Sequence, residues 1–287
     1  MLLSQQLSTI YFHNKSYPTM RMTTIKLIIM GSLFLNNKLI YAQEKKDTVK
    51  ELSINEEIQQ ELSPIYLKGQ LKSMHLWRGI AVTNAIVLDV DAGISTKDGK
   101  LKSGVWGGYG ANGVYREFDY YVTYAPTKNL TFALWDIYNY STNATWNNSN
   151  FFEYSADKTG HFLDLSVSYT ISDKMPLNLY WATVIQGRDR GINNEKNLYS
   201  TYVQASYPVI RKKGVDLNLY IGGAFALSPE KDQKSKNFYG PKSGIASLGF
   251  VATKTLHLGR YNLPISATTS WSPINKAGNI QLAFDFF

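Results

Sequence analysis

Val215-Asp-Leu-Asn-Leu-Tyr-Ile221 is the stretch that most clearly indicates how this chain folds. Apolar residues occupy every second position from Val215 to Ile221, and Asp216 and Asn218 lie between them. Because successive side chains of a β-strand point to opposite faces, this period of two predicts a strand with one apolar and one polar face. Similar runs end at Ile171, Trp271 and Phe286, and residues 63–287 show no convincing helical period.

The alternating runs divide residues 63–287 into twelve expected strands, an even number typical of single-chain bacterial barrels. The expected strands are 65–77, 84–95, 103–111, 114–125, 129–140, 161–171, 177–187, 198–208, 214–227, 244–254, 261–271 and 279–287. Every second connection is short, as expected for turns at one end of a barrel: 96–100, 126–128, 172–176, 209–213 and 255–260. The longest of the remaining connections, expected at the opposite end, are 141–160, 188–197 and 228–243.

Alternation alone fits either a soluble sandwich or a membrane barrel, which differ in the direction of the apolar face. The composition favours the barrel, because 287 residues with no Cys have no disulfides, and 20 Tyr and 6 Trp supply aromatic residues near strand ends. The last run alternates up to the final residue and resembles the C-terminal signal for barrel assembly, here Phe284, Phe286 and Phe287. We therefore expect an all-β, transmembrane, antiparallel up-and-down barrel of about twelve strands. The alternative is an eight- or ten-stranded barrel with a capping extension.

The N-terminal residues resemble a targeting segment. Lys26 precedes the apolar run 27–35, and Ala42 is followed by polar residues, which is the pattern of a cleaved secretory signal peptide. We expect a signal peptide over 1–42, with Met20 or Met22 as the true start, a polar tether or short helix over 43–62, and the barrel over 63–287. The alternative for the apolar run is a buried strand.

Residues 1–42 hold four of the 30 basic residues and no acidic ones, so the net charge of +8 is no basis for nucleic-acid binding.

Four segments in the first half of the barrel carry a family resemblance. They are Leu76-Trp-Arg-Gly-Ile80, Val87-Leu-Asp-Val-Asp-Ala-Gly-Ile94, Ser103-Gly-Val-Trp-Gly-Gly108 and Glu117-Phe-Asp-Tyr-Tyr121. Together they resemble the TorF-type (Gcw-type) porin family of bacterial outer-membrane β-barrels. The resemblance covers about residues 70–125, and it implies an outer-membrane barrel classed as a porin.

Charged residues on the polar faces of the expected strands are the candidates for lining the barrel interior. Asp89 and Asp91 share one face, and Glu117 and Asp119 share another. The full set of pore-lining candidates is Lys68, Lys72, Arg78, Asp89, Asp91, Glu117, Asp119, Asp164, Asp216 and Asp285. They would form either a charged constriction that selects solutes or a network of ion pairs that fills a narrow interior. A Ca²⁺ site is a weaker alternative, since nothing in the spacing requires one.

The sequence predicts an outer-membrane porin that lets small solutes pass through a charge-lined lumen. The alternative is a non-conducting barrel that serves as a structural or interaction component of a larger envelope assembly. We expect no enzyme, because His75, His161 and His257 lie in no catalytic motif, and we expect no cofactor and no metal. The expected partners are the outer-membrane bilayer, the barrel-assembly machinery, small solutes and an outer-membrane protein, with no nucleic acid.

Overall fold

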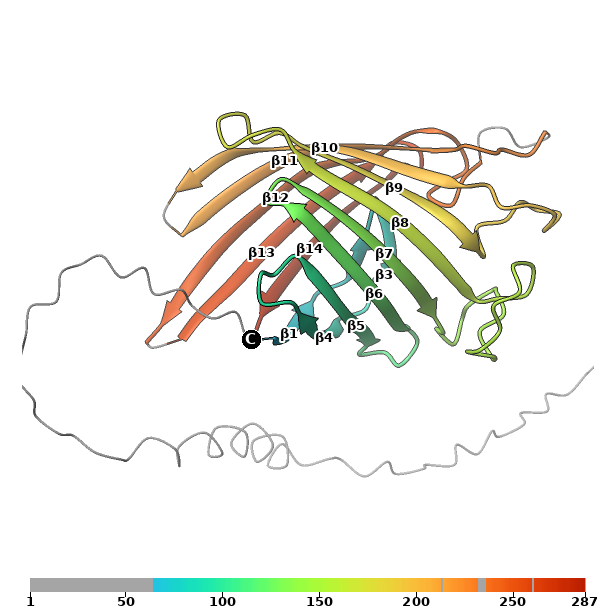
Figure 1. Cartoon of the computed structure of the whole chain (residues 1–287), viewed down its shortest axis with the longest axis horizontal. Helices are drawn as coiled ribbons and strands as arrows, with labels where there is room; N and C mark the ends of the chain where they lie inside the picture. The colour runs from blue at the N-terminus through green and yellow to red at the C-terminus, as the bar shows by residue number, and fades with distance from the viewer. Residues whose placement is uncertain (1–63, 213, 232–235, 260, 287) are drawn as a thin grey trace, which may run out of the picture. The chain divides into compact units, whose positions relative to one another are not determined.

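A computed structural model describes residues 64–212, 214–231, 236–259 and 261–286. All of the described residues belong to one compact unit. Within the described residues, twelve antiparallel strands close into an up-and-down barrel, which confirms the predicted fold (Figure 1). No helix of the described part is long and apolar enough to cross a membrane. The expected signal peptide 1–42, the tether 43–62 and Phe287 lie outside the described residues.

The wall of the barrel follows chain order, with each strand paired to its neighbours and β1 paired to both β14 and β4. The wall strands are β1 (Ile65–Lys72), β4 (Val87–Ser95), β5 (Leu101–Gly110), β6 (Arg116–Thr127), β7 (Leu130–Asn139), β8 (His161–Thr170), β9 (Asn178–Gly187), β10 (Ser200–Lys212), β11 (Val215–Ala226), β12 (Gly244–Leu258), β13 (Tyr261–Ser272) and β14 (Ala277–Asp285). Two further strands, β2 (His75–Trp77) and β3 (Ile80–Thr83), form a separate two-stranded sheet.

The wall is apolar outside and polar inside. On β4, Leu88 and Ile94 are exposed on the outer surface, whereas Asp89 between them is buried. On β8, Leu165 is exposed and its neighbour Asp164 is buried. This arrangement is the reverse of a soluble β-sandwich and matches the pattern of a barrel whose outer face contacts lipid.

The connections separate into two sets, as the sequence predicted. One end of the barrel, which we name the turn end, carries the connections 96–100, 128–129, 171–177, 213–214 and 259–260. The opposite end, the loop end, carries 73–86, 111–115, 140–160, 188–199, 227–243 and 273–276. The strands β10 and β12 are longer than expected, so their turns are correspondingly shorter.

The expected first strand, 65–77, is wrong in its second half. Its wall strand β1 ends at Lys72, where it pairs with both Ala283 and Val87. The chain then leaves the wall and forms the β2–β3 hairpin, which Figure 1 shows in cyan inside the curve of the wall strands. A hairpin strand has the same period of two as a wall strand, so the period by itself does not show where the chain leaves the wall.

Candidate functional site

The β2–β3 hairpin turns at Arg78 and Gly79. Both residues have positive φ angles, 47° and 84°, as a two-residue type I′ turn requires. The backbone N–H of Leu76 donates to Oε1 of Gln281 on β14, at 2.9 Å. The hairpin is therefore tied to the wall near its base, and its tight turn carries Arg78 to the opposite side of the interior.

Arg78 is the anchor of the hairpin. Its Nη1 donates to Oδ1 of Asp164 on β8 at 2.8 Å and its Nη2 to Oδ2 at 2.5 Å, a bidentate pair with both side chains almost fully buried. The hydroxyls of Tyr180 and Tyr239 accept further hydrogen bonds from the guanidinium, at 2.5 and 2.8 Å. The ring of Trp77 lies 4.6 Å from the same cation. Both terminal nitrogens of the guanidinium thus have hydrogen-bond acceptors.

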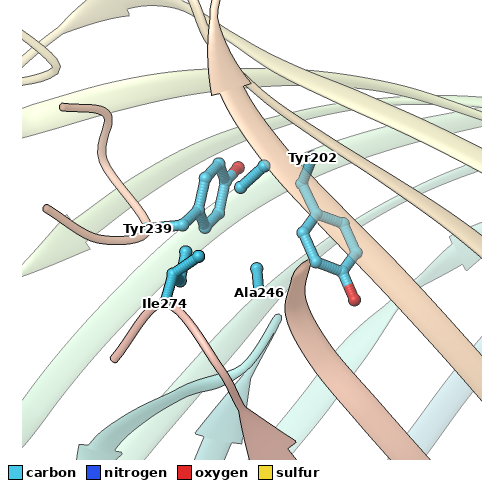
Figure 2. Close-up of a cluster of buried hydrophobic side chains, with 5 residues drawn as sticks. Tyr202, Tyr239, Ala246 and Ile274 are labelled. Atoms are coloured by element: carbon cyan, nitrogen blue, oxygen red, sulfur yellow. The ribbon is translucent and has the colours of Figure 1, made fainter. Parts of the chain in front are cut away.

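The tip of the hairpin fits tightly against β12. A Cβ atom placed on Gly79 would lie 2.1 Å from the carbonyl oxygen of Ala246. Ala246 belongs to a buried cluster with Tyr202, Tyr239 and Ile274, which Figure 2 shows in close-up. Only glycine combines the positive φ with this close approach, which explains why the Arg-Gly dipeptide forms the tip.

Side chains from three long loop-end connections cover the interior. Trp146 of loop 140–160 donates from its ring nitrogen to the carbonyl of Asn139, and its ring stacks 3.9 Å from the Arg188 guanidinium. Arg188 begins loop 188–199 and also lies 4.7 Å from the ring of Phe162. The ring of Phe238, from loop 227–243, lies 5.1 Å from the Arg188 guanidinium. The three loops therefore meet over the barrel interior at one arginine.

A cavity of about 690 Å³ lies beneath this cover and beside the hairpin. Its volume is within the range of small-molecule binding sites. Aromatic side chains make up much of its lining, and the carboxylates of Glu117 and Asp119 on β6 also line it. Glu117 accepts a hydrogen bond from Nδ2 of Asn139 at 2.8 Å, and Asp119 accepts one from the backbone N–H of Tyr138 at 3.2 Å.

The structure divides the predicted pore-lining residues into two groups. Five of them line the cavity: Lys72, Arg78, Glu117, Asp119 and Asp164. The others, Lys68, Asp89, Asp91, Asp216 and Asp285, lie outside its lining. Asp89 forms an ion pair with Lys72 at 2.9 Å, Asp91 accepts from the Tyr121 hydroxyl, and Asp285 accepts from Gln70. Lys68 and Asp216 are exposed toward the turn end.

The position of Arg78 differs from the expectation, which placed it on the first wall strand. It lies on the internal hairpin and reaches a carboxylate 86 residues further along the chain. At the C-terminus, Phe284 and Phe286 are exposed on the outer side, and the N–H of Phe286 donates to the carbonyl of Gly69.

The three described histidines lie in different surroundings. His161 is buried, with Nδ1 2.7 Å from Oδ1 of Asp136 and Nε2 2.6 Å from the carbonyl of Phe151, so both ring nitrogens are engaged. His75 stacks on Trp106, and His257 contacts Asn262 near the turn end. Among the described residues, no cluster of three or more His, Asp or Glu side chains is arranged to hold a metal ion.

Several residues of the site were not among the sequence candidates, above all Gly79, Trp146, Arg188 and Phe238. An Arg-Gly pair between apolar dipeptides is a weak hairpin signal and could have indicated the turn at Gly79. The loop residues carried no comparable signal, because their positions depend on three connections that meet only when the barrel closes.

Asp189, next to Arg188, links loop 188–199 to the start of β10. Its carboxylate accepts from the backbone N–H and the hydroxyl of Ser200, both at 2.7 Å. Burial raises the pKa of Asp189 to about 6, although the Ser200 hydrogen bonds oppose this shift. The Asp189 carboxyl therefore binds its proton more tightly in the folded protein than in the unfolded chain, where an Asp carboxyl titrates near pH 4. The contribution of Asp189 to stability is therefore fully present below about pH 4 and is lost as the pH rises to about 6.

We expect the amides of Leu198 and Ser200 to be better protected from hydrogen exchange at about pH 5 than at about pH 7.5, after correction for intrinsic rates. Both amides report on this loop, since the N–H of Leu198 donates to the carbonyl of Asp189. Asp189→Asn should remove the pH dependence. Protection that stays constant or rises with pH in the unmodified protein would contradict the assignment.

The fold and the interior together define a class: a closed twelve-stranded barrel, apolar outside, whose lumen contains a docked hairpin and a cavity lined by charged and aromatic side chains. No protein-family model matches this chain. A search of curated proteins also finds no significant match.

Proposed function

We propose that this chain is an outer-membrane channel for small solutes, in which the β2–β3 hairpin narrows the lumen. The outward apolar face supports a location in a bilayer, because a soluble barrel would bury these side chains. Export by the expected signal peptide would bring the chain to the outer membrane, with the barrel-assembly machinery as its partner during insertion. The segmental resemblance to TorF-type porins agrees with this proposal.

The observation that carries the proposal is the charge-lined cavity inside the barrel. A barrel whose interior had only a structural role would be filled by packed side chains. Here about 690 Å³ remains open, bordered by Glu117, Asp119, Lys72 and Arg188. Charged groups around a narrow passage select permeating ions by their sign.

One observation favours a second candidate, a closed barrel that acts as a structural or interaction component. The hairpin is held by the bidentate Arg78–Asp164 pair, and Trp146, Arg188 and Phe238 cover the cavity at the loop end. An interior held in this way would not conduct unless the hairpin or the loops moved.

Single-channel recording of the refolded protein in a planar bilayer tests the proposal. We expect discrete conductance steps with a preference for cations, because Glu117 and Asp119 face the cavity. The double variant Glu117→Gln with Asp119→Asn should reduce the cation preference, since it removes both carboxylates with little change in shape.

Asp173→Asn is the matched control, because it makes the same chemical change in an exposed turn-end residue that is paired with Lys128. It should leave selectivity unchanged. A correctly folded barrel without conductance, in every preparation, would reject the channel and favour the closed barrel.

A further inference from the structure

The charges around the cavity do not all pair with one another. Lys72 pairs with Asp89 at 2.9 Å, and Arg78 pairs with Asp164. Among the cavity-lining charges this leaves one cation, Arg188, and two carboxylates, Glu117 and Asp119. The two carboxylates attract Arg188 electrostatically but are not in direct contact with it. Within the described residues, no ion pair of 4.0 Å or less joins Arg188 to a carboxylate.

Arg188 is partly buried, and aromatic rings lie around its side chain. The rings of Trp146, Phe162 and Phe238 surround its guanidinium at 3.9–5.1 Å. Its buried Nε has no hydrogen-bond acceptor among the described residues. Burial lowers the pKa of Arg188 to about 10, so the group remains charged at neutral pH. A partly buried cation with aromatic neighbours and no carboxylate in direct contact is stabilised by an anion that binds beside it.

Glu117 and Asp119 have open acceptor positions on the same cavity. They lie two residues apart on β6, so both side chains point inward. A carboxylate can accept about four hydrogen bonds, and the bonds from Asn139 and from the Tyr138 backbone leave capacity on both groups. The two carboxylates therefore form a place where a cation with several N–H donors would be held.

We propose that the cavity binds a small zwitterion that carries an ammonium group, a carboxylate and an apolar body, as a free amino acid does. The carboxylate would accept from Arg188, the ammonium would donate to Glu117 and Asp119, and the apolar body would pack against Trp77 and Phe162, which also line the cavity. The inference rests on the proposed function, since it names the solute that the channel would select.

Ligands with a single charge fit these surroundings less well. An amine without a carboxylate would leave the Arg188 guanidinium without an anion in contact. A carboxylate without an amine would bring a third negative group close to Glu117 and Asp119. Only a ligand with both charges compensates both parts of the cavity.

Isothermal titration of the folded protein in detergent micelles tests the site with three probes of similar shape. L-phenylalanine has both charged groups, 2-phenylethylamine lacks the carboxylate, and 3-phenylpropionate lacks the amine. We expect L-phenylalanine to bind, and each probe that lacks one group to bind about tenfold or more weakly, because a charge-assisted hydrogen bond is lost. L-leucine should also bind, since the lining is apolar rather than specific for a ring.

Variants assign each charge to its partner. Arg188→Gln should weaken the binding of L-phenylalanine about tenfold or more but should not weaken that of 2-phenylethylamine. Glu117→Gln with Asp119→Asn should weaken the binding of L-phenylalanine and 2-phenylethylamine, which both carry an ammonium group. It should not weaken the binding of 3-phenylpropionate. Arg190→Gln is the matched control, because this neighbouring arginine bonds to Asn194 in an exposed part of the same loop.

The outcomes separate the site from the channel. No heat from either amino acid, or equal binding of all three phenyl probes, would overturn the zwitterion site even if the protein conducts. Binding by a barrel that never conducts would support the site and reject the channel. The three-probe comparison uses the unmodified protein, so it holds even where a variant fails to refold, as judged by heat-dependent gel mobility.

Discussion

Arg78→Ala is expected to release the β2–β3 hairpin from the barrel wall and to increase conductance. The substitution leaves the Asp164 carboxylate buried without its bidentate partner, and breaking a buried ion pair in this way typically costs about 3–5 kcal/mol. The hydroxyls of Tyr180 and Tyr239 lose their donor as well. Since the hairpin forms no part of the wall ladder, this cost should appear as undocking of the hairpin rather than as unfolding of the barrel.

Conductance in planar bilayers measures the release. Variants with Arg78→Ala should show larger or more frequent open steps than the unmodified protein. Replacing residues 74–85 by an Asn-Gly turn sets the upper limit, because Lys72 and Val87 already face each other in the wall and need only a short connection.

The control for Arg78 is the apolar double variant Arg78→Met with Asp164→Leu. It removes both charges, so no buried charge is left without a partner, and such replacements are often neutral or stabilising. We expect its hairpin to stay docked and its conductance to resemble that of the unmodified protein. If Arg78→Ala, the double variant and the hairpin deletion all conduct alike, the hairpin does not narrow the passage.

Gly79→Ala is expected to displace the hairpin tip from β12. The φ angle of 84° is unfavourable for alanine, which costs about 1–2 kcal/mol. The added Cβ would also lie 2.1 Å from the carbonyl oxygen of Ala246, so the tip or the strand must move. The backbone strain and the steric clash both weaken the contact between the hairpin tip and β12.

Thiol labelling measures the displacement, because the chain contains no cysteine and a single one can be placed freely. Ala81→Cys puts a thiol on β3 at the cavity lining. A membrane-impermeant maleimide should label this thiol faster when Gly79→Ala is also present.

Gly113→Ala is the matched control for Gly79. Its φ angle is 73°, yet the nearest atom to an added Cβ is the Tyr109 hydroxyl at 3.6 Å. It therefore introduces backbone strain without a collision. Equal labelling rates for the two alanine variants would show that the close approach to Ala246 does not hold the tip.

Much of the wall could be predicted from local pattern. The faces of 215–221, the inward position of Asp119 and the division into short and long connections all follow from the period of two and from turn residues. These features depend on neighbours within a few residues, which a single sequence displays directly.

The interior could be predicted only in part. The period of two predicts inward faces for Asp164 and Glu117. Nothing in the sequence indicates that Asp164 pairs with Arg78 or that Glu117 faces a cavity. The wall strand expected over 65–77 ends at Lys72 in the structure. A period of two predicts a strand but does not show which sheet the strand joins.

By itself, the sequence of this protein determined an antiparallel barrel with apolar residues outside and charges inside. The tertiary structure alone decided that 75–83 folds into the lumen, that Arg78 crosses to Asp164, and that Trp146, Phe162 and Phe238 enclose Arg188. The physical reason is the range of the interactions. The direction of a side chain follows from local backbone geometry, whereas partners across a lumen are set only when the first and last strands of the wall meet.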